Sequence, residues 1–418
     1  MECCAVCGVK WDMLRILLLL FLASLPSFAQ EEFGRDLPDL IQGNERFGRK
    51  LLLLVDSATS DRNIVISPVS LTIIFAALQT NSEGGPASIR MEMADAFGWG
   101  EYPNLGVPAR MLLAAFEKPK QEPSQAKQRS QAFRFAHYPP EGAWITNDVL
   151  YRGKDTLSTR FVSDAQKYYG VSFKSTGNLR PSTADLKGAR HPGSLLPKIS
   201  SQNDILISSG THLQTAWSGN TFSMSRPRES GFTTASGELR QVKVLDSELS
   251  GYLYAKTETF EAVVLPCNNA YMLAILPGPT KSARDVETLL SESSDSVDAV
   301  LKKQPGVVTM PFFHFQFEAN LRPQIEQLGI KKPFEDLGSL IRIPKSHLTE
   351  VSQRTDIQVD QSGIRASAES IVGAIYGGIG TAQNAFHLEL NRPFVFLIRD
   401  RTTNALMFLG VVSDPSKS

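Results

Sequence analysis

Histidine is the side chain that most often provides acid–base chemistry or metal ligation near neutral pH, and this 418-residue chain has six of them. They are His137, His191, His212, His314, His347 and His387. None of them pair at metal-ligand spacing, and the sequence has no HExxH motif. The GxSxG nucleophile elbow, the P-loop and the GxGxxG motif are missing as well. The sequence therefore predicts no catalytic site, no metal and no cofactor, and the chain is expected not to be an enzyme.

One pattern of a nucleophilic serine does occur. Ser124-Gln-Ala-Lys127 has the SxxK spacing of penicillin-recognising enzymes. It lies in a polar stretch, residues 117–142, that is rich in Lys, Gln, Ser and Pro, and not at the start of an apolar helix. The companion SDN and KTG motifs are missing. Chance is the preferred explanation, and a penicillin-recognising hydrolase is the weakest alternative.

The four cysteines offer little chemistry. Cys3, Cys4 and Cys7 resemble half of a zinc site, but no partner cluster of Cys or His follows them. The fourth, Cys267, is expected in the core or in a strand. With a single cysteine after the N-terminal region, the chain is expected to have no internal disulfide, so its stability must come from a large core.

A long stretch of small residues near the C-terminus is the most unusual feature. Between Gly363 and Gly380 the side chains alternate, and one phase is apolar or small while the other begins with charged and polar residues. The first phase comprises Ile364, Ala366, Ala368, Ser370, Val372 and Ala374. A period of two is typical of a half-buried strand, yet Ala, Ser and Gly fix a strand poorly. Two interpretations stay open at this level: a Gly/Ala-rich surface loop, or a loop that can become a strand.

The composition allows one large domain or two ordinary ones. Hydrophobic residues make up 42% of the chain and charged residues 21%, as in soluble globular proteins. The formal net charge of +0 argues against nucleic acid or an anionic membrane as a partner.

The N-terminal region predicts export. Met13-Leu-Arg15 is a short basic start, residues 16–25 are apolar, and Ser27-Phe28-Ala29 has the small residues of a cleavage site. The apolar run is too short to span a bilayer. We therefore expect a signal peptide at residues 1–29, with 1–12 as an atypical lead-in.

The remaining segments predict helices early and strands late, with no internal repeat, which favours an α+β domain. Helices are expected at 44–55, 69–78, 89–97, 161–169, 283–290, 296–303 and 321–328. Strands are expected at 63–68, 145–151, 204–209, 233–244, 251–255, 260–265, 271–276 and 307–317. The apolar runs 394–398 and 406–409, separated by Asp400-Arg-Thr-Thr-Asn404, predict a buried hairpin.

Several segments, taken in order, resemble the motifs of the serpin family over nearly the whole chain after residue 29. Each motif is weak alone, but their order and spacing are specific. They are Asn63-Ile-Val-Ile-Ser-Pro-Val-Ser70, Asn147-Asp-Val-Leu-Tyr151, the run from Phe161 to Gly170, Trp217 with Phe222, the run from Val308 to Phe315, Leu328-Gly-Ile330 with Phe334, Asn391 to Asp400, and Gly410 to Pro415.

The resemblance implies a single serpin domain over 30–418. It implies an α+β fold with three β-sheets, about eight or nine helices, and an exposed reactive-centre loop at about 361–386. In that family the loop is bait for a serine protease, or in second place a cysteine protease. After cleavage its hinge inserts as a strand into the large sheet, and the protease stays trapped as an acyl-enzyme. Insertion needs an alternating, Pro-free hinge, which this chain has.

The resemblance assigns the hinge to Gln361, Gly363, Ile364, Ala366, Ala368 and Ser370. Three positions depart from the family pattern: Gln361 replaces Glu, Ile364 replaces Thr or Ser, and Arg365 replaces Glu. Ile364 can be buried without cost, and Arg365 should face solvent, so neither blocks insertion.

The resemblance also implies a buried polar cluster under the large sheet, from Ser67, Ser70, Ser209 and Gln353, with Trp217 packed at the top of that sheet. Here Gln353 stands for the usual His and Ser209 for the usual Asn; both can hydrogen-bond. The run 161–170 resembles the start of the helix that crosses the sheet. The region after it, 182–201, is shortened and contains Pro and Gly, which puts the inhibitory rate in question.

Family spacing from Gly363 places the scissile bond at Gly377. The loop is longer than usual after this point, so Tyr376, Gly377 and Gly378 are all candidates. Tyr376 suits a chymotrypsin-like pocket, and Gly377 an elastase-like enzyme that accepts small residues.

The implied function is a secreted inhibitor of a serine-type endopeptidase, extracellular, or periplasmic in a bacterial host. The alternative is a non-inhibitory serpin that acts as a carrier. A polyanion or glycosaminoglycan site is the minority interpretation of a set of basic residues that otherwise form a solvated loop. These are Lys118, Lys120, Lys127, Arg129 and Arg134. A monomer is expected.

Overall fold

The structure is a computed structural model that describes most of the chain between residues 27 and 417. The described ranges are 27–59, 62–82, 88–100, 105–117, 142–151, 157–175, 204–219, 221–222, 226–292, 297–341, 345–366 and 385–417.

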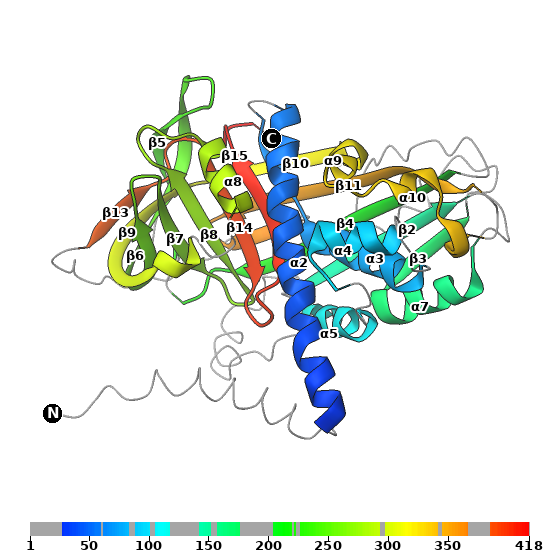
Figure 1. The fold of residues 1–418 in the computed structure, drawn as a ribbon. Helices are drawn as coiled ribbons and strands as arrows, with labels where there is room; N and C mark the ends of the chain where they lie inside the picture. Colours follow the sequence, from blue (N-terminus) through cyan, green and yellow to red (C-terminus); the bar gives the residue numbers. More distant parts are fainter. Residues whose placement is uncertain are drawn as a thin grey trace, which may run out of the picture.

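Eight α-helices occur in these ranges, and they gather mainly around one end and one face of the molecule (Figure 1). They are α2 (Ser27–Thr59), α3 (Pro68–Asn81), α4 (Ile89–Phe97), α5 (Gly106–Glu117), α7 (Thr159–Tyr169), α8 (Ala283–Glu292), α9 (Arg322–Gln327) and α10 (Lys332–Glu335). Two short 3-10 helices are η2 (Asp298–Val300) and η3 (Gly338–Leu340).

The strands form two hydrogen-bonded sheets that lie side by side (Figure 1). The nine-stranded sheet has the order β1-β15-β14-β8-β7-β6-β9-β13, with β5 also paired to β6. Its strands are β1 (Ile64–Ile66), β5 (Arg228–Thr233), β6 (Leu239–Lys256), β7 (Phe260–Pro266), β8 (Ala270–Pro277), β9 (Lys302–Pro311), β13 (Phe386–Glu389), β14 (Phe394–Asp400) and β15 (Leu406–Val412).

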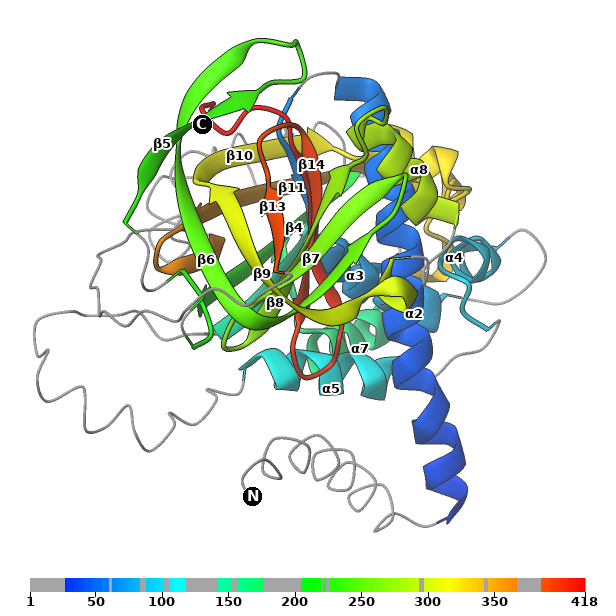
Figure 2. The ribbon, with the colours of Figure 1, turned by 90° about the vertical axis from the view of Figure 1, so that its left-hand side faces the viewer.

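The six-stranded sheet has the order β10-β11-β12-β4-β2-β3. Its strands are β2 (Gly142–Tyr151), β3 (Val171–Ser175), β4 (Asp204–Ala216), β10 (Phe313–Asn320), β11 (His347–Asp360) and β12 (Gly363–Ala366). Figure 2 shows this sheet behind the nine-stranded one, with α5 and α7 beneath them.

The expected three sheets correspond to three groups of strands, two of which are joined. The long strands β6 and β9 pair on both sides of a register shift between Leu249 and Tyr252. One part of β6 pairs with β5, and the other part pairs with β7. Hydrogen bonding is therefore continuous through β6 and β9, and the two smaller groups merge into one nine-stranded sheet.

Helix α3 occupies the centre of the molecule, since it is mainly apolar and has no charged residue. Every residue from Pro68 to Gln79 is buried, and α3 packs against α2, α4, α5 and α7 as well as both sheets. Pro68 at the first helical position fits the start of a helix, where no backbone donor is needed. The same core contains the hairpin of β14 and β15, in which all residues of both strands are buried.

Some local expectations were wrong. The expected helix at 296–303 is a strand after its first turn, because β9 begins at Lys302 and pairs with β6. Tertiary pairing overrides weak local propensity here. The expected strands 233–244 and 251–255 fall mainly in the single long strand β6. Helix α5 was not expected at all.

Helix α7 does not cross the six-stranded sheet, although the run 161–170 was expected to begin a helix that does. It packs against α3 and α5, on the face of the six-stranded sheet where those helices lie, and it ends at Gly170 with φ of 61°. A left-handed residue ends the helix and turns the chain directly into β3. The region 182–201, which was expected to be altered, lies outside the described residues.

Candidate functional site

The six-stranded sheet divides part-way along two of its central strands. β11 and β4 pair in parallel from His347↔Asp204 to Gln353↔Ser209. Beyond this level β12 lies between them, antiparallel to both. The hinge that the sequence predicted as insertable therefore begins inside the sheet, with four residues already in place as a strand.

The inward phase of β12 matches the inward phase of both neighbours. Ile364 is fully buried, and its cross-strand partners Val359 and Thr215 are buried as well. Ala366 pairs with the buried Leu213. Side chains on directly opposed residues share a face of the sheet, so this register places Ile364 on the core face together with Val359 and Thr215.

Gly363 fits where it stands because no side chain could. Its φ is 147°, and a Cβ atom built there would lie 2.1 Å from the Thr215 carbonyl oxygen and 2.7 Å from the Ala216 Cα. Both obstacles are backbone atoms of β4, which cannot move away without breaking the ladder. Glycine is the residue that allows close approach of two backbones at such a point.

Arg365 does not face solvent, contrary to the expectation. Its side chain is 7% exposed, and its Nη2 atom lies 3.3 Å from the Asp360 Oδ2 atom. Its Nη1 atom has no hydrogen-bond partner among the residues that the structure describes. The hairpin turn between β11 and β12 brings Asp360 back beside Arg365, which gives the guanidinium a carboxylate to pair with in a buried position.

A polar cluster lies beneath the level where β11 and β4 stop pairing. The Gln353 carboxamide accepts a hydrogen bond from the Ser67 backbone N–H at 2.8 Å. It donates to the Ser67 carbonyl oxygen at 2.8 Å and to the Ser70 hydroxyl at 3.1 Å. Gln353 thus connects β11 to the start of α3 with both ends of its amide.

The cluster continues across the sheet through residues that the sequence did not predict. The Ser209 hydroxyl donates to the Asn147 Oδ1 atom at 2.8 Å, and the Asn147 Nδ2 atom donates to the Ser70 carbonyl oxygen at 3.0 Å. The Ser67 hydroxyl donates to the Met407 carbonyl oxygen and lies 2.5 Å from the Thr211 Oγ1 atom.

Ser209 and Asn147 together take the place of the Asn that is usual in the family at the position of Ser209. Asn147 is the cross-strand partner of Ser209 on β2, so the carboxamide reaches the cluster from the next strand. The one sequence signal was the motif Asn147-Asp-Val-Leu-Tyr151 itself, whose first residue carries the carboxamide.

Trp217 follows the end of β4 and contacts Asp360, the last residue of β11, just before the hinge. It is 6% exposed, and its ring meets Phe222 edge-on at 5.0 Å between centroids. Its Nε1 atom donates to the Asp360 carbonyl oxygen at 2.8 Å. It also bridges by backbone to Cys267, which is buried. Trp217 therefore ties the end of β4 to the turn that leads into β12.

The other end of the loop returns as β13 in the nine-stranded sheet. Phe386 stacks on Tyr254 with ring centroids 3.7 Å apart, and a Cβ atom at Gly306 would lie 2.2 Å from the Phe386 ring. Burial raises the pKa of Tyr254, and the hydrogen bond from its hydroxyl to Glu261 acts in the same direction. The two ends of the loop are thus fixed in different sheets.

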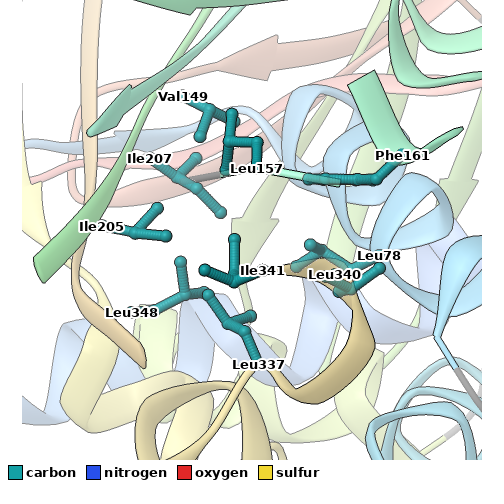
Figure 3. A pocket seen from close by; sticks show the side chains of 10 residues that line it. All are labelled: Leu78, Val149, Leu157, Phe161, Ile205, Ile207, Leu337, Leu340, Ile341 and Leu348. Carbon is teal, nitrogen blue, oxygen red and sulfur yellow. The ribbon is translucent and has the colours of Figure 1, made fainter. Parts of the chain in front are cut away.

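A small apolar cavity lies against the six-stranded sheet at the level where β4 and β11 pair directly (Figure 3). It has a volume of about 10 Å³, which is room for a single water-sized sphere. Ile205 and Ile207 of β4 face it from the sheet, and Phe161 and Leu340 from the helical side.

Several predicted residues lie outside the described part of the chain. These are the hinge residues Ala368 and Ser370, the bond candidates Tyr376, Gly377 and Gly378, the SxxK pair Ser124 and Lys127, and the basic residues Lys118, Lys120, Arg129 and Arg134. Within the described part, no cluster of His, Cys, Asp and Glu could hold a metal ion. No helix there is long and apolar enough to cross a membrane.

Comparison with known proteins agrees with this arrangement. A family model described as "Serpin (serine protease inhibitor)" matches residues 42–415. A serine protease inhibitor of Cyanea capillata is 24% identical over 376 residues, which is 85% of this chain and 93% of the relative. The human plasma serine protease inhibitor is 25% identical over 373 residues, which is 86% of each chain.

Among solved structures, human thyroxine-binding globulin complexed with thyroxine is similar with a TM-score of 0.73. The sequence identity is 17%, and the match covers 91% of this chain and 99% of the other. At this identity the likeness concerns the fold alone.

Proposed function

The chain belongs to the serpin family, and from that premise we propose that it is a secreted inhibitor that traps a serine-type endopeptidase. In this proposal the segment between β12 and β13 is the bait loop, with its scissile bond at Tyr376, Gly377 or Gly378. Cleavage lets the hinge continue into the six-stranded sheet, and the protease is carried with it.

The position of β12 is the observation that carries the proposal. Ile364 is fully buried between β11 and β4, and further hinge residues would continue from β12 toward the level where these two strands pair directly. Continuing the same register sets Ala368 between Thr355 and Thr211, and Ser370 between Gln353 and Ser209. Each of these neighbours is buried, so only small or apolar hinge residues fit, and the sequence supplies them.

The chemistry belongs to the protease. Its serine hydroxyl attacks the carbonyl carbon of the scissile bond, the new amine leaves, and an ester links the protease to the hinge side of the loop. Insertion then displaces the protease before water can hydrolyse the ester. The serpin contributes the bait, the small inward phase and a sheet that can open.

The test is incubation with chymotrypsin and with elastase, followed by a denaturing gel and mass spectrometry of the cut site. We expect a stable complex of higher mass with at least one of them. Cleavage of the loop by every protease tried, with no complex, would sink the proposal.

A matched pair of variants tests the hinge register. Ala366→Arg puts a charge in the inward phase, and Ser367→Arg puts the same charge in the outward phase. We expect Ala366→Arg to be cleaved without forming a complex, because a buried unpaired guanidinium blocks insertion. Ser367→Arg should still trap the protease. Equal trapping by both variants would contradict the register.

Heating separates inhibition from the carrier alternative. If the loop inserts after cleavage, the cut protein gains a strand in the six-stranded sheet and melts at a clearly higher temperature. An unchanged melting temperature after complete cleavage would favour a carrier. Export is supported by the N-terminal segment, and sequencing the N-terminus of secreted material tests the expected start at Gln30.

A further inference from the structure

We propose that Asp360 and Arg365 form a charge latch that holds the first four hinge residues in the six-stranded sheet before any protease cuts the loop. This inference rests on the proposed inhibitory function for its purpose, but the latch itself can be tested without a protease. It assigns to two residues of the hinge hairpin a positioning role.

The geometry makes Asp360 the centre of the hairpin turn. One carboxylate oxygen, Oδ1, accepts from the Ser362 backbone N–H at 2.7 Å. The other, Oδ2, accepts from Gln358 Nε2 at 3.1 Å and from Arg365 Nη2 at 3.3 Å. The carbonyl oxygen of the same residue accepts from the Trp217 indole. The turn therefore connects β11, β12 and the end of β4 through one residue.

The burial of Arg365 makes the ion pair important for the stability of β12 in the sheet. The guanidinium is 7% exposed, its Nη1 atom makes no hydrogen bond, and Asp360 is its only ion-pair partner among the described residues. A buried charge that loses its partner is strongly unfavourable, whereas the same charge in water is not. Without the Asp360 charge, the simplest relief for Arg365 is to leave the sheet, and it takes β12 with it.

Withdrawal of β12 from the sheet would lose little apolar burial. β12 has only four residues, and its sole large apolar side chain in the described part is Ile364. Its side chains are otherwise Gly, Ala and Arg, which contribute little apolar burial. The balance between an inserted and a withdrawn hinge therefore depends on Asp360 more than it would in a longer, more apolar strand.

The experiment is hydrogen–deuterium exchange at the amides of residues 363–366 in the intact, uncleaved protein. In the wild type these amides should be protected. In Asp360→Asn, which keeps the acceptor for Ser362, we expect exchange at least about tenfold faster, because the unpaired guanidinium drives the hinge out. Exchange at the wild-type rate in Asp360→Asn would overturn the latch.

A second variant separates charge from turn geometry. It is the double variant Asp360→Asn/Arg365→Met. The methionine removes the buried charge of Arg365 and keeps an unbranched apolar side chain. Protection at 363–366 should return to the wild-type level. If the double variant exchanges as fast as Asp360→Asn, the turn and not the ion pair holds the hinge, and the proposal is wrong.

Asp356→Asn is the matched control. Asp356 is another carboxylate of β11, but it pairs with His314 and Gln316 of β10, away from the hinge. Its replacement should leave exchange at 363–366 unchanged. Faster exchange there would mean that any lost charge on β11 loosens the hinge, which would contradict a specific latch.

A functional readout then connects the latch to trapping. With the hinge withdrawn, insertion must start from the first residue, so more molecules are cut before the protease is trapped. Asp360→Asn should consume more inhibitor per trapped protease than the wild type, and the double variant should restore the wild-type ratio. If the wild type traps no protease at all, the proposed function fails, while the exchange experiment still decides the latch.

Discussion

The two sheets of this molecule are held together in different ways. In the nine-stranded sheet, all residues of β14 and β15 are buried, and nearly all are apolar. In the six-stranded sheet, β11 alternates between buried and half-buried residues, and buried polar side chains cross it in one row. That row runs through Gln353, Ser209 and Asn147.

The difference fits the proposed function, in which the hinge inserts into one sheet and the other sheet stays closed. Apolar burial contributes several kcal/mol per large side chain and cannot be regained by another arrangement of the same strands. A hydrogen bond has a small net contribution, of about 1 kcal/mol, and can be made again with a new partner. A sheet that opens is better joined by hydrogen bonds, and a sheet that stays closed by apolar packing.

The largest expected effect lies in the closed sheet. Phe396 of β14 is fully buried and meets Phe313 of β10 at 5.8 Å between ring centroids. Phe396→Ala should lower the free energy of unfolding by about 3–5 kcal/mol, because it removes a large apolar side chain and leaves a cavity. Urea unfolding followed by fluorescence measures it. A loss below about 1 kcal/mol would mean that this sheet is no more tightly packed than the other.

The next effect concerns a buried carboxyl group on α8, a helix that packs against the nine-stranded sheet. Glu287 of α8 is 1% exposed, and in the described part of the chain neither of its carboxyl oxygens has a hydrogen-bond partner. Burial, and after it the charge of Asp56, raises the pKa of Glu287 from 4.5 to about 9. Arg284 opposes this shift. α8 packs against β8 and β14, two interior strands of the nine-stranded sheet.

The sign of its pH dependence follows from the raised pKa. Between about pH 4.5 and 9 the folded protein keeps the proton and the unfolded chain has lost it. The contribution of Glu287 to stability is therefore fully present below this window and is lost as pH rises through it, by about 1.4 kcal/mol per pH unit. Glu287→Gln should remove this slope, which denaturation at pH 6, 7 and 8 measures. Glu292→Gln, an exposed residue of the same helix, is the control, and equal slopes in all three proteins would contradict the prediction.

The third prediction tests the polar row of Gln353, Ser209 and Asn147 in the six-stranded sheet. Gln353→Ala deletes the acceptor of the Ser67 N–H and two further hydrogen bonds. A buried amide left without a partner costs about 1–3 kcal/mol, so stability should fall by that amount, less than for Phe396→Ala. The cluster contains no titratable side chain, so the loss should be the same at pH 6 and pH 8. A pH-dependent loss would show that the polar row couples to a group outside it.

Much of this contrast could be predicted from the sequence, because it depends on local patterns. The runs 394–398 and 406–409 are apolar without interruption, which indicates a strand that is buried on both faces. The alternation from Ile364 onward indicates a strand with one buried face.

The remainder depends on pairing between distant segments. Arg365 looked solvent-exposed because the outward phase of a strand normally is, and only the turn geometry places Asp360 beside it. Asn147 joins the polar cluster because β2 pairs with β4 in one particular register, which no local pattern encodes. Helix α5 was missed because it begins with Gly106 and has Pro108 in its first turn; both are weak helix formers, although a proline is tolerated in the first turn.

The smallest expected effect is the sharpest test of the comparison, because two facing threonines should respond with opposite signs. Thr355 of β11 and Thr211 of β4 are both buried, one on each side of the place where the hinge would continue. Within the described ranges the Thr355 hydroxyl has no hydrogen-bond partner, whereas Thr211 Oγ1 bonds with the Ser67 hydroxyl. Thr355→Val should therefore raise the free energy of unfolding by about 1 kcal/mol, and Thr211→Val should lower it by about 1 kcal/mol. Urea unfolding of both variants at one pH measures the pair. A loss in both variants would mean that the Thr355 hydroxyl also makes a hydrogen bond that stabilises the fold. The polar row would then extend from the level of Gln353 toward β12.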